Sequence, residues 1–190
     1  SYARYLQEAG ADALELNVFL MPSDFGKTCD EREKTYFQII EEVKKYTEIP
    51  VSLKISFYSN NLGSLIQELS YSGIDGLVLF NRLYSPDINI NKLETVSSNI
   101  LSSPSEISLP LRWIGIMSER AECDLAASTG IHDGTGLIKL LLAGAKVVQV
   151  ASTLYRNGKS QIHTMLGDLE TWMESKQFKK LDDFREIGRA

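Results

Sequence analysis

The nine residues Leu142-Ala143-Gly144-Ala145-Lys146-Val147-Val148-Gln149-Val150 contain the pattern that decides the fold. An amphipathic helix ends there on a glycine, and a β-rich run begins two or three residues later. The same pattern occurs at residues 8–16 (EAGADALEL) and at residues 71–79 (YSGIDGLVL). A glycine in this position can adopt the left-handed conformation that ends many helices. Three such junctions indicate that helices and strands alternate along the chain.

Two further runs have the composition of strands in the same scheme. Residues 51–56 follow Pro50, which stops the helix before it, and residues 124–129 precede a glycine-containing turn. The predicted strands therefore begin near residues 13, 51, 76, 124 and 147. Their mean spacing of roughly 33 residues is close to the ~31 residues per unit of an eight-unit barrel.

Apolar residues at helical spacing predict the helices between these strands. Thr28 and Glu31 form a possible capping box, and Asp133 is a plausible N-cap. The segment from residue 83 to residue 123 is too long for a simple connection. Its Ser/Asn-rich part, residues 97–105, is compatible with a lid, a subunit contact or a solvated loop. The expected helices cover residues 31–46, 62–72, 110–120, 134–143 and 161–175.

Five βα units are compatible with a doubly wound sheet or with part of a (β/α)₈ barrel. The first helical residues, from Tyr2 to Gly10, have neither an initiator Met before them nor a clear cap. This favours an α/β TIM (β/α)₈ barrel of which only about the last five units are present. Residues 1–190 are then expected to be the C-terminal part of a single domain whose first three strands lie upstream.

The composition excludes several classes of function. The chain has 190 residues, of which 43% are hydrophobic, so it can bury a core. Its formal net charge of -5 argues against nucleic acid as a partner. No apolar run approaches the ~18 residues of a membrane span. The two cysteines are too few for a disulfide framework and lack metal-ligand spacing, so a cytoplasmic protein without a metal is expected.

Small and hydroxyl residues follow the last two predicted strands. Ser128, Thr129 and Gly130 end the first of them, and Ala151 and Ser152 end the second. Such residues let backbone N–H groups approach an anion closely. At the last two strands of a barrel, these turns predict a phosphate site. Ordinary turns and helix caps use the same residues, so this alternative stays open.

Lys54 is the most suggestive single residue. On its strand Val51, Leu53 and Ile55 share one face, which leaves Ser52, Lys54 and Ser56 on the other. A lysine there would point into the barrel and need an anionic or dipolar partner. The N1–C2=O edge of a flavin would suit it electrostatically. The alternatives are a salt bridge with Glu15 and an edge lysine with its ammonium in solvent.

Asn17 and Asn81 each occupy the C-terminal end of a predicted strand. An amide both donates and accepts hydrogen bonds, so a pair of asparagines suits the edge of a planar heterocycle. Asparagine also ends strands for purely local reasons, and this alternative applies to either residue alone.

Taken in order, these segments resemble the dihydroorotate dehydrogenase family over nearly the whole chain. The resemblance implies an FMN-binding TIM barrel that forms a homodimer in the cytosolic class. It also implies that Lys54 contacts the flavin ring and that Asn17 and Asn81 face a pyrimidine substrate. The phosphate would be held by main-chain N–H groups of Thr129, Gly130, Ala151 and Ser152. The motifs that carry the resemblance are Glu15-Leu16-Asn17, Val51 to Lys54, Leu79-Phe80-Asn81, Ala127 to Ile131, Leu142 to Ala145, Gln149 to Leu154 and the tail Phe178 to Arg185.

The chain departs from the family on the substrate side. In the family, the loop after the first asparagine contains a Cys or Ser that acts as the base and is followed by Pro-Asn. In this chain Met21 occupies the position of the base, and Ser23 occupies the position of the loop asparagine. A thioether cannot accept the substrate proton. Ser23 and Cys29 are the weak substitutes on the same loop, so no catalytic residue is assigned. Arg82 replaces a small hydroxyl residue of the family.

The sequence therefore predicts an FMN-dependent oxidoreductase that transfers hydride between a flavin and a small planar substrate. The family's own reaction, dihydroorotate to orotate in pyrimidine biosynthesis, is put in doubt by Met21. Two alternatives remain. One is a non-redox, phosphate-binding barrel enzyme such as a sugar-phosphate isomerase or aldolase. The other is a catalytically silent flavin-binding subunit.

Overall fold

A sheet of five parallel strands forms the centre of the molecule in the computed structural model, which describes residues 2–83, 85–98, 100–185 and 187–188. The strands neighbour one another in sequence order, and each begins at the predicted residue or one residue later. This confirms the predicted succession of βα units. The strands are β1 (Leu14–Asn17), β2 (Val51–Ile55), β3 (Gly76–Leu79), β6 (Asp124–Ser128) and β7 (Val147–Gln149).

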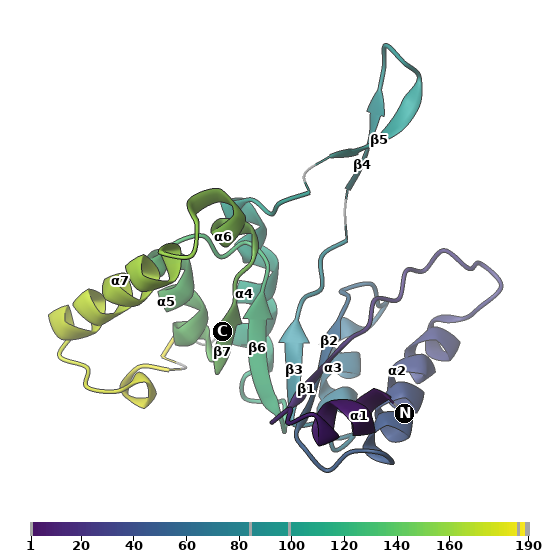
Figure 1. Cartoon of the computed structure of the whole chain (residues 1–190), viewed down its shortest axis with the longest axis horizontal. Coiled ribbons are helices and arrows are strands. Elements are labelled where there is room, and N and C mark those ends of the chain that lie inside the picture. Colours follow the sequence, from purple (N-terminus) through teal and green to yellow (C-terminus); the bar gives the residue numbers. More distant parts are fainter. Residues whose placement is uncertain (1, 84, 99, 186, 189–190) are drawn as a thin grey trace.

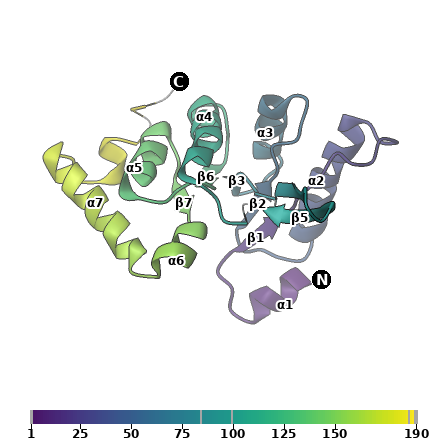
Figure 2. The ribbon, with the colours of Figure 1, turned by 90° about the horizontal axis from the view of Figure 1, so that it is seen from above.

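The helices cover only one face of this sheet. Figure 2 shows them as an arc around the strands, with α1 (Tyr2–Glu8) and α6 (Ser152–Asn157) at its two ends. A doubly wound sheet has helices on both faces, so that alternative is excluded. The arc is open, because β1 and β7 are edge strands of the described sheet. The outer helices are α2 (Cys29–Lys44), α3 (Leu62–Ser70), α4 (Ser108–Met117), α5 (Gly134–Ala143) and α7 (Gln161–Ser175).

Local signals cap two helices as the sequence predicts, but several helix bounds differ from the predicted ones. Helices α2, α3 and α4 end at Lys44, Ser70 and Met117, two or three residues before the predicted ends. The Thr28 capping box is formed, and the Asp133 carboxylate accepts from the Gly136 N–H at 2.7 Å. However, α2 begins at Cys29, two residues earlier than predicted. Helix α4 begins at Ser108, so Pro110 is its third residue rather than its first. A proline is tolerated there because N–H groups of the first turn have no partner within the helix.

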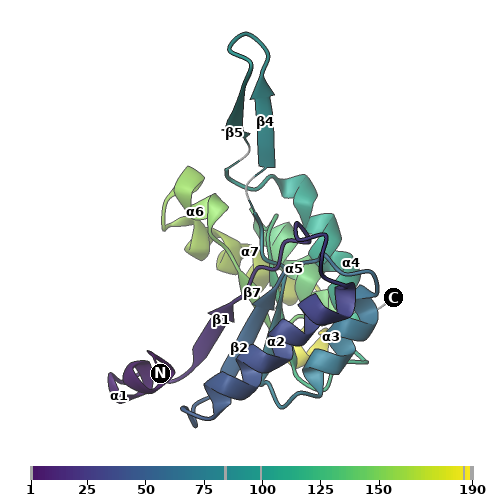
Figure 3. The ribbon, with the colours of Figure 1, turned by 90° about the vertical axis from the view of Figure 1, so that its right-hand side faces the viewer.

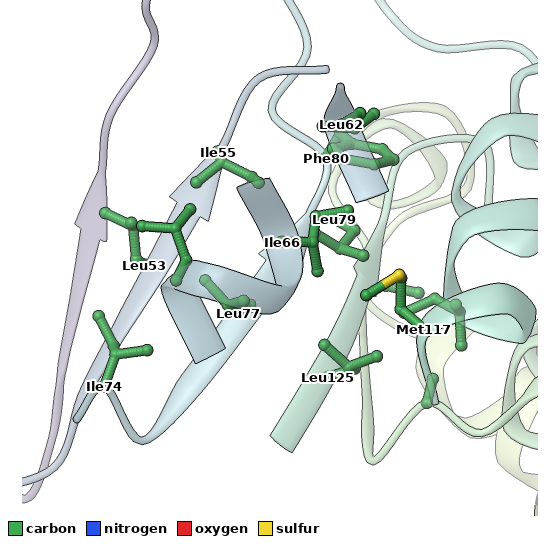
Figure 4. Close-up of a cluster of buried hydrophobic side chains, with 14 of the residues drawn as sticks. Leu53, Ile55, Leu62, Ile66, Ile74, Leu77, Leu79, Phe80, Met117 and Leu125 are labelled. Atoms are coloured by element: carbon green, nitrogen blue, oxygen red, sulfur yellow. The ribbon is translucent and has the colours of Figure 1, made fainter. Parts of the chain in front are cut away.

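The hydrophobic core lies between the sheet and the outer helices. Leu53 and Ile55 point from β2 toward Ile66 of α3, as Figure 4 shows. Ser52 and Lys54 are on the opposite, open face, as the alternation of the strand predicts.

Ser56 does not share that open face, and this part of the prediction is wrong. Strand β2 ends at Ile55, so the alternation no longer applies to the next residue. Ser56 is buried, and its hydroxyl lies 3.1 Å from the Tyr36 hydroxyl of α2. It also donates to the Leu20 carbonyl at 3.2 Å. Burial raises the pKa of Tyr36, and its hydrogen bonds with Ser56 partly oppose this. Ser56 therefore links the loop after β1 to helix α2 through its hydrogen bonds.

An antiparallel hairpin interrupts the βα pattern after β3. Its strands β4 (Ser85–Asn89) and β5 (Glu94–Ser98) project from the body of the molecule (Figures 1 and 3). The 3₁₀ helix η1 (Pro104–Ile107) follows, and a second one, η2 (Leu181–Asp183), lies near the C-terminus. The sequence predicted a loop at residues 97–105 and missed the hairpin. We call residues 100–107, which run back from the hairpin to α4, the strap.

Candidate functional site

A pocket of about 510 Å³ lies at the carboxyl ends of β2, β3, β6 and β7. Ligand pockets of proteins commonly enclose ~300–1,000 Å³, so this one can admit a small organic molecule. The site thus lies at the end of the strands where α/β folds place their ligands. Its lining residues are Lys54, Asn81, Arg82, Ile100, Ser102, Ser128, Thr129, Gly130, Ile131, Gln149, Val150, Ala151 and Ser152.

The pocket brings together all the residues predicted to bind a cofactor, from three strands that are distant in sequence. Those residues are Lys54, Ser128, Thr129, Gly130, Ala151 and Ser152. Of the two asparagines predicted to face the substrate, Asn81 lines the pocket. Asn17 lies beside it, and its side-chain oxygen accepts a hydrogen bond from the Asn81 amide.

The pocket favours an anionic ligand by its charge. Its lining includes two cations, Lys54 and Arg82, and no carboxylate of the described residues lines it. Serine hydroxyls and turn backbones supply further donors. This donor set fits a phosphate group together with an electron-rich ring edge.

The first predicted phosphate turn has an unusual backbone. Thr129 and Gly130 both have positive φ angles, of 83° and 82°. A β-branched residue rarely adopts this conformation, which costs on the order of 1–3 kcal/mol. The Thr129 hydroxyl donates to the Phe80 carbonyl at 3.2 Å and so helps to hold the turn. Both residues of the turn line the pocket.

The second turn begins α6. Ala151 is its N-cap and Ser152 its first residue, so their N–H groups have no partner within the helix. The Ser152 hydroxyl accepts from the Ser102 N–H of the strap at 2.9 Å. A hydroxyl that accepts one hydrogen bond can still donate one, so Ser152, which lines the pocket, keeps a donor for a ligand.

Gly130 has a structural role that the sequence did not indicate. A Cβ atom at this position would lie 2.2 Å from the backbone nitrogen of Ile107 in the strap. Only glycine allows the strap to pass so close to the turn. Substitution of Gly130 would therefore displace the strap whether or not a phosphate binds here.

Ser102 and His132 belong to the site, although no motif identified their roles. Ser102 is 4% exposed and lines the pocket. Its hydroxyl lies 3.1 Å from Nε2 of His132. The His132 carbonyl accepts from the Thr153 hydroxyl at 3.0 Å and from the Gln161 amide at 2.9 Å. These contacts join the strap to the turns after β6 and β7.

Arg82 is paired within the protein. Its Nε donates to a Glu106 carboxylate oxygen at 2.7 Å, and its guanidinium also donates to the Ile100 carbonyl at 2.9 Å. Burial alone would raise the pKa of Glu106, but the hydrogen bonds from Arg82 and Ser103 hold this pKa below its ordinary value. Arg82 therefore fastens the strap beside the end of β3.

Lys54 is half-buried in the pocket wall, and its partner differs from the one expected. Its ammonium donates to Oε1 of Gln149 at 2.9 Å, and the Gln149 amide donates to the Glu15 carboxylate. The ion pairs of the described residues do not include a direct one between Lys54 and Glu15. Burial lowers the pKa of Lys54, and the charge of Glu15 partly opposes this shift.

The loop after β1 places no proton acceptor in the pocket. Met21 is 41% exposed, and Ser23 is exposed as well. Cys29 starts α2, where its thiol donates to a Glu33 carboxylate oxygen at 3.1 Å. None of these three residues lines the pocket.

The described residues contain no group of three or more His, Cys, Asp or Glu side chains that could hold a metal ion. None of the described helices combines the length and hydrophobicity needed to cross a bilayer.

Comparisons with known proteins agree on one family. The chain is 26% identical over 182 residues to the dihydroorotate dehydrogenase B (NAD(+)) catalytic subunit of Thermoplasma volcanium, covering 94% of this chain and 60% of that protein. It is 28% identical to the same subunit of Saccharolobus solfataricus, covering 90% and 59%. The chain is thus similar to dihydroorotate dehydrogenase B catalytic subunits over most of its own length. No family model matches it.

The fold agrees with this relationship. A crystal structure of the dihydroorotate dehydrogenase of Eimeria tenella, in complex with ferulenol, superimposes with a TM-score of 0.71 at 16% identity. The match covers 97% of this chain and 57% of that one. The chain thus spans about 60% of the length of the curated relatives it matches. It has the α/β fold of a TIM-barrel fragment, and its described residues do not close the barrel.

Proposed function

We propose that this chain is the C-terminal part of an FMN-dependent oxidoreductase and that the pocket binds the flavin. The observation that carries the proposal is the convergence of Lys54 with the two turns after β6 and β7 in one pocket, which no carboxylate of the described residues lines. The similarity to dihydroorotate dehydrogenase B subunits supports the same assignment.

Different residues of the pocket would bind different parts of the cofactor. Thr129, Gly130, Ala151 and Ser152 would hold the phosphate with backbone N–H groups, and the Ser128 and Ser152 hydroxyls would add donors. The Lys54 ammonium would face the ring edge that becomes negative on reduction. When bound, the flavin supplies the site that accepts or donates hydride.

The substrate would meet the paired asparagines. The hydrogen bond between Asn17 and Asn81 uses one donor and one acceptor, and the remaining amide groups can bind a small planar molecule with both kinds of group. Arg82 adds a bulky side chain at the same end of the pocket. We infer that the substrate differs from dihydroorotate, because Met21 cannot act as the base.

The complete protein would contain a barrel that this chain only partly forms. We propose that residues 1–190 are the C-terminal part of a single domain and that strands upstream of residue 1 pair with the open edges of β1 and β7. Those strands would contribute further flavin contacts. A cytoplasmic homodimer is part of the same proposal, by analogy with the cytosolic class of the family.

Flavin binding tests the proposal. The protein, extended by its upstream segment, should bind FMN more tightly than riboflavin, because only FMN carries the phosphate. Lys54→Met should weaken binding of both ligands about tenfold or more, since a hydrogen bond to a charged group contributes ~1.5–3 kcal/mol. Lys139→Met, on the exposed surface of α5, is the matched control. Equal affinity for FMN and riboflavin, or no effect of Lys54→Met, would contradict the assignment.

The lowered pKa of Lys54 favours a second candidate function, that of a non-redox enzyme. A lysine whose pKa is lowered by burial, as that of Lys54 is, deprotonates more easily and can form a Schiff base with a carbonyl substrate. A phosphorylated aldehyde or ketone would suit the pocket of a non-redox enzyme. Reduction with borohydride should then attach such a substrate to Lys54, and absence of an adduct favours the flavin. Bound flavin that no donor or acceptor turns over would instead indicate a silent subunit.

A further inference from the structure

A chain of polar side chains crosses the open face of the sheet. It starts at the Lys54 ammonium on β2, passes through the Gln149 amide on β7 and ends at the Glu15 carboxylate on β1. Strands β1 and β7 are the two edges of the five-stranded sheet. Only the curvature of the arc brings side chains of these two edges within hydrogen-bond distance (Figure 2).

The chemistry of the two ends fixes the orientation of the middle residue. An ammonium only donates hydrogen bonds, and an ionised carboxylate only accepts them. The Gln149 oxygen must therefore face Lys54, and its NH₂ group must face Glu15. Both polar ends of the amide are satisfied in this arrangement, which leaves Gln149 a single orientation.

We propose that Gln149 is a positioning residue that holds the Lys54 ammonium in the pocket and links it to the charge of Glu15. The role of Gln149 toward the flavin rests on the proposed function. Its role toward Lys54 does not, because the three side chains form this chain of hydrogen bonds without any ligand. Lys54 would then reach the pocket as a fixed cation rather than as a mobile side chain.

The electrostatic surroundings explain why such support is needed. Burial disfavours the charged form of Lys54, and the Glu15 carboxylate favours it. The other charged groups near this chain of side chains are Arg82 at the rim, which is paired with Glu106, and Asp75, Asp124 and Lys146, which line one cavity together with Glu15 and Gln149. The amide oxygen of Gln149 is the group in direct contact with the ammonium, so changes at this position should act on its protonation.

Two substitutions of Gln149 should move the pKa of Lys54 in opposite directions. Gln149→Leu removes the amide dipole, so the neutral amine becomes easier to form and the pKa falls. Gln149→Glu places a carboxylate beside the ammonium, so the pKa rises. At a pH well below the pKa of Lys54, each unit by which this pKa falls raises the fraction of neutral lysine about tenfold. Competitive acetylation of the flavin-free protein across a pH series, read by mass spectrometry of the Lys54 peptide, gives the midpoint for each variant.

Controls separate this role from a merely structural one. Gln38→Leu and Gln38→Glu, on the exposed face of α2, should leave the Lys54 midpoint unchanged. Glu15→Gln should lower it, and this variant carries the test if Gln149→Leu does not fold. Shifts of equal sign for the two Gln149 variants, or no shift, would overturn the proposal. Because no flavin is present, failure here is distinguishable from failure of the FMN assignment.

Discussion

The two cations of the pocket have partners of different kinds, and this determines which of them can serve a ligand. Arg82 is held by the Glu106 carboxylate, which neutralises its charge. Lys54 is held by a neutral amide, so its positive charge is not cancelled by the group it contacts. An anionic part of a ligand should therefore be drawn toward Lys54 rather than toward Arg82.

The replacement of the family's base by Met21 predicts slow turnover of dihydroorotate. A general base contributes ~10²–10⁴ in rate, and a thioether cannot supply this. Met21→Ser should therefore increase orotate formation by the flavin-loaded, extended protein, measured with an artificial electron acceptor. Cys29→Ala should not alter the remaining activity, because Cys29 lies eight residues beyond the family's base position and its thiol donates to Glu33. Rapid dihydroorotate oxidation that Cys29→Ala abolishes would contradict this interpretation.

At the scale of elements, the strap acts as a fixed wall of the pocket. Arg82 binds it beside the end of β3, Gly130 lets it pass against the end of β6, and Ser152 binds it at the end of β7. Two hydrogen-bonded attachments and one close backbone approach, at three strand ends, hold the strap against the body of the molecule. The hairpin projects beyond it, away from the body of the molecule (Figure 3).

The ion pair between Arg82 and Glu106 should stabilise the protein in a pH-dependent way. The pKa of Glu106 is lowered in the folded state, so its contribution is present above the unfolded pKa of ~4.3 and is lost as the pH falls through the folded value. Because Glu106 is partly solvated, we expect a coupling of about 0.5–1 kcal/mol at neutral pH. A double-mutant cycle with Arg82→Met and Glu106→Gln, followed by urea unfolding, measures this coupling. The coupling should decrease as the pH is lowered below ~4.3, and a coupling independent of pH would refute the assignment.

At the scale of the whole molecule, the open arc leaves apolar side chains exposed near its ends. Val147 on β7 is 57% exposed, and Tyr2 of α1 and Tyr155 of α6 are exposed as well. An edge strand also presents backbone groups without a partner in the sheet. Both features agree with the proposal that further strands complete the barrel.

Hydrogen exchange should show that the edge strands of the sheet are less protected than the central strands. In the 190-residue chain, amides of β1 and β7 should exchange faster than those of β2 and β3, which are paired on both sides. Addition of the upstream segment should slow exchange in the two edge strands. Mass spectrometry of labelled peptides measures both rates. Equal protection of all five strands in the 190-residue chain would show that the edges are already covered.

The sequence by itself determined the βα succession and the positions of the two turns after β6 and β7, because both depend on local rules. Alternation along β2 placed Lys54 on the open face, and Gly144 marked the end of α5 with its left-handed backbone. Each of these signals lies within a few residues, so no knowledge of the tertiary structure is needed to interpret it. The hairpin escaped prediction because its short strands are polar and exposed, without a buried face to create a pattern.

Only the tertiary structure decided how the site is supported. The Gln149 amide and the Glu15 carboxylate are 134 positions apart, and they meet because the sheet curves. The close approach of the strap to Gly130 likewise depends on how two distant segments pack. Periodicity tells which face a side chain occupies, but twist and curvature of the whole sheet decide which side chains of that face come into contact.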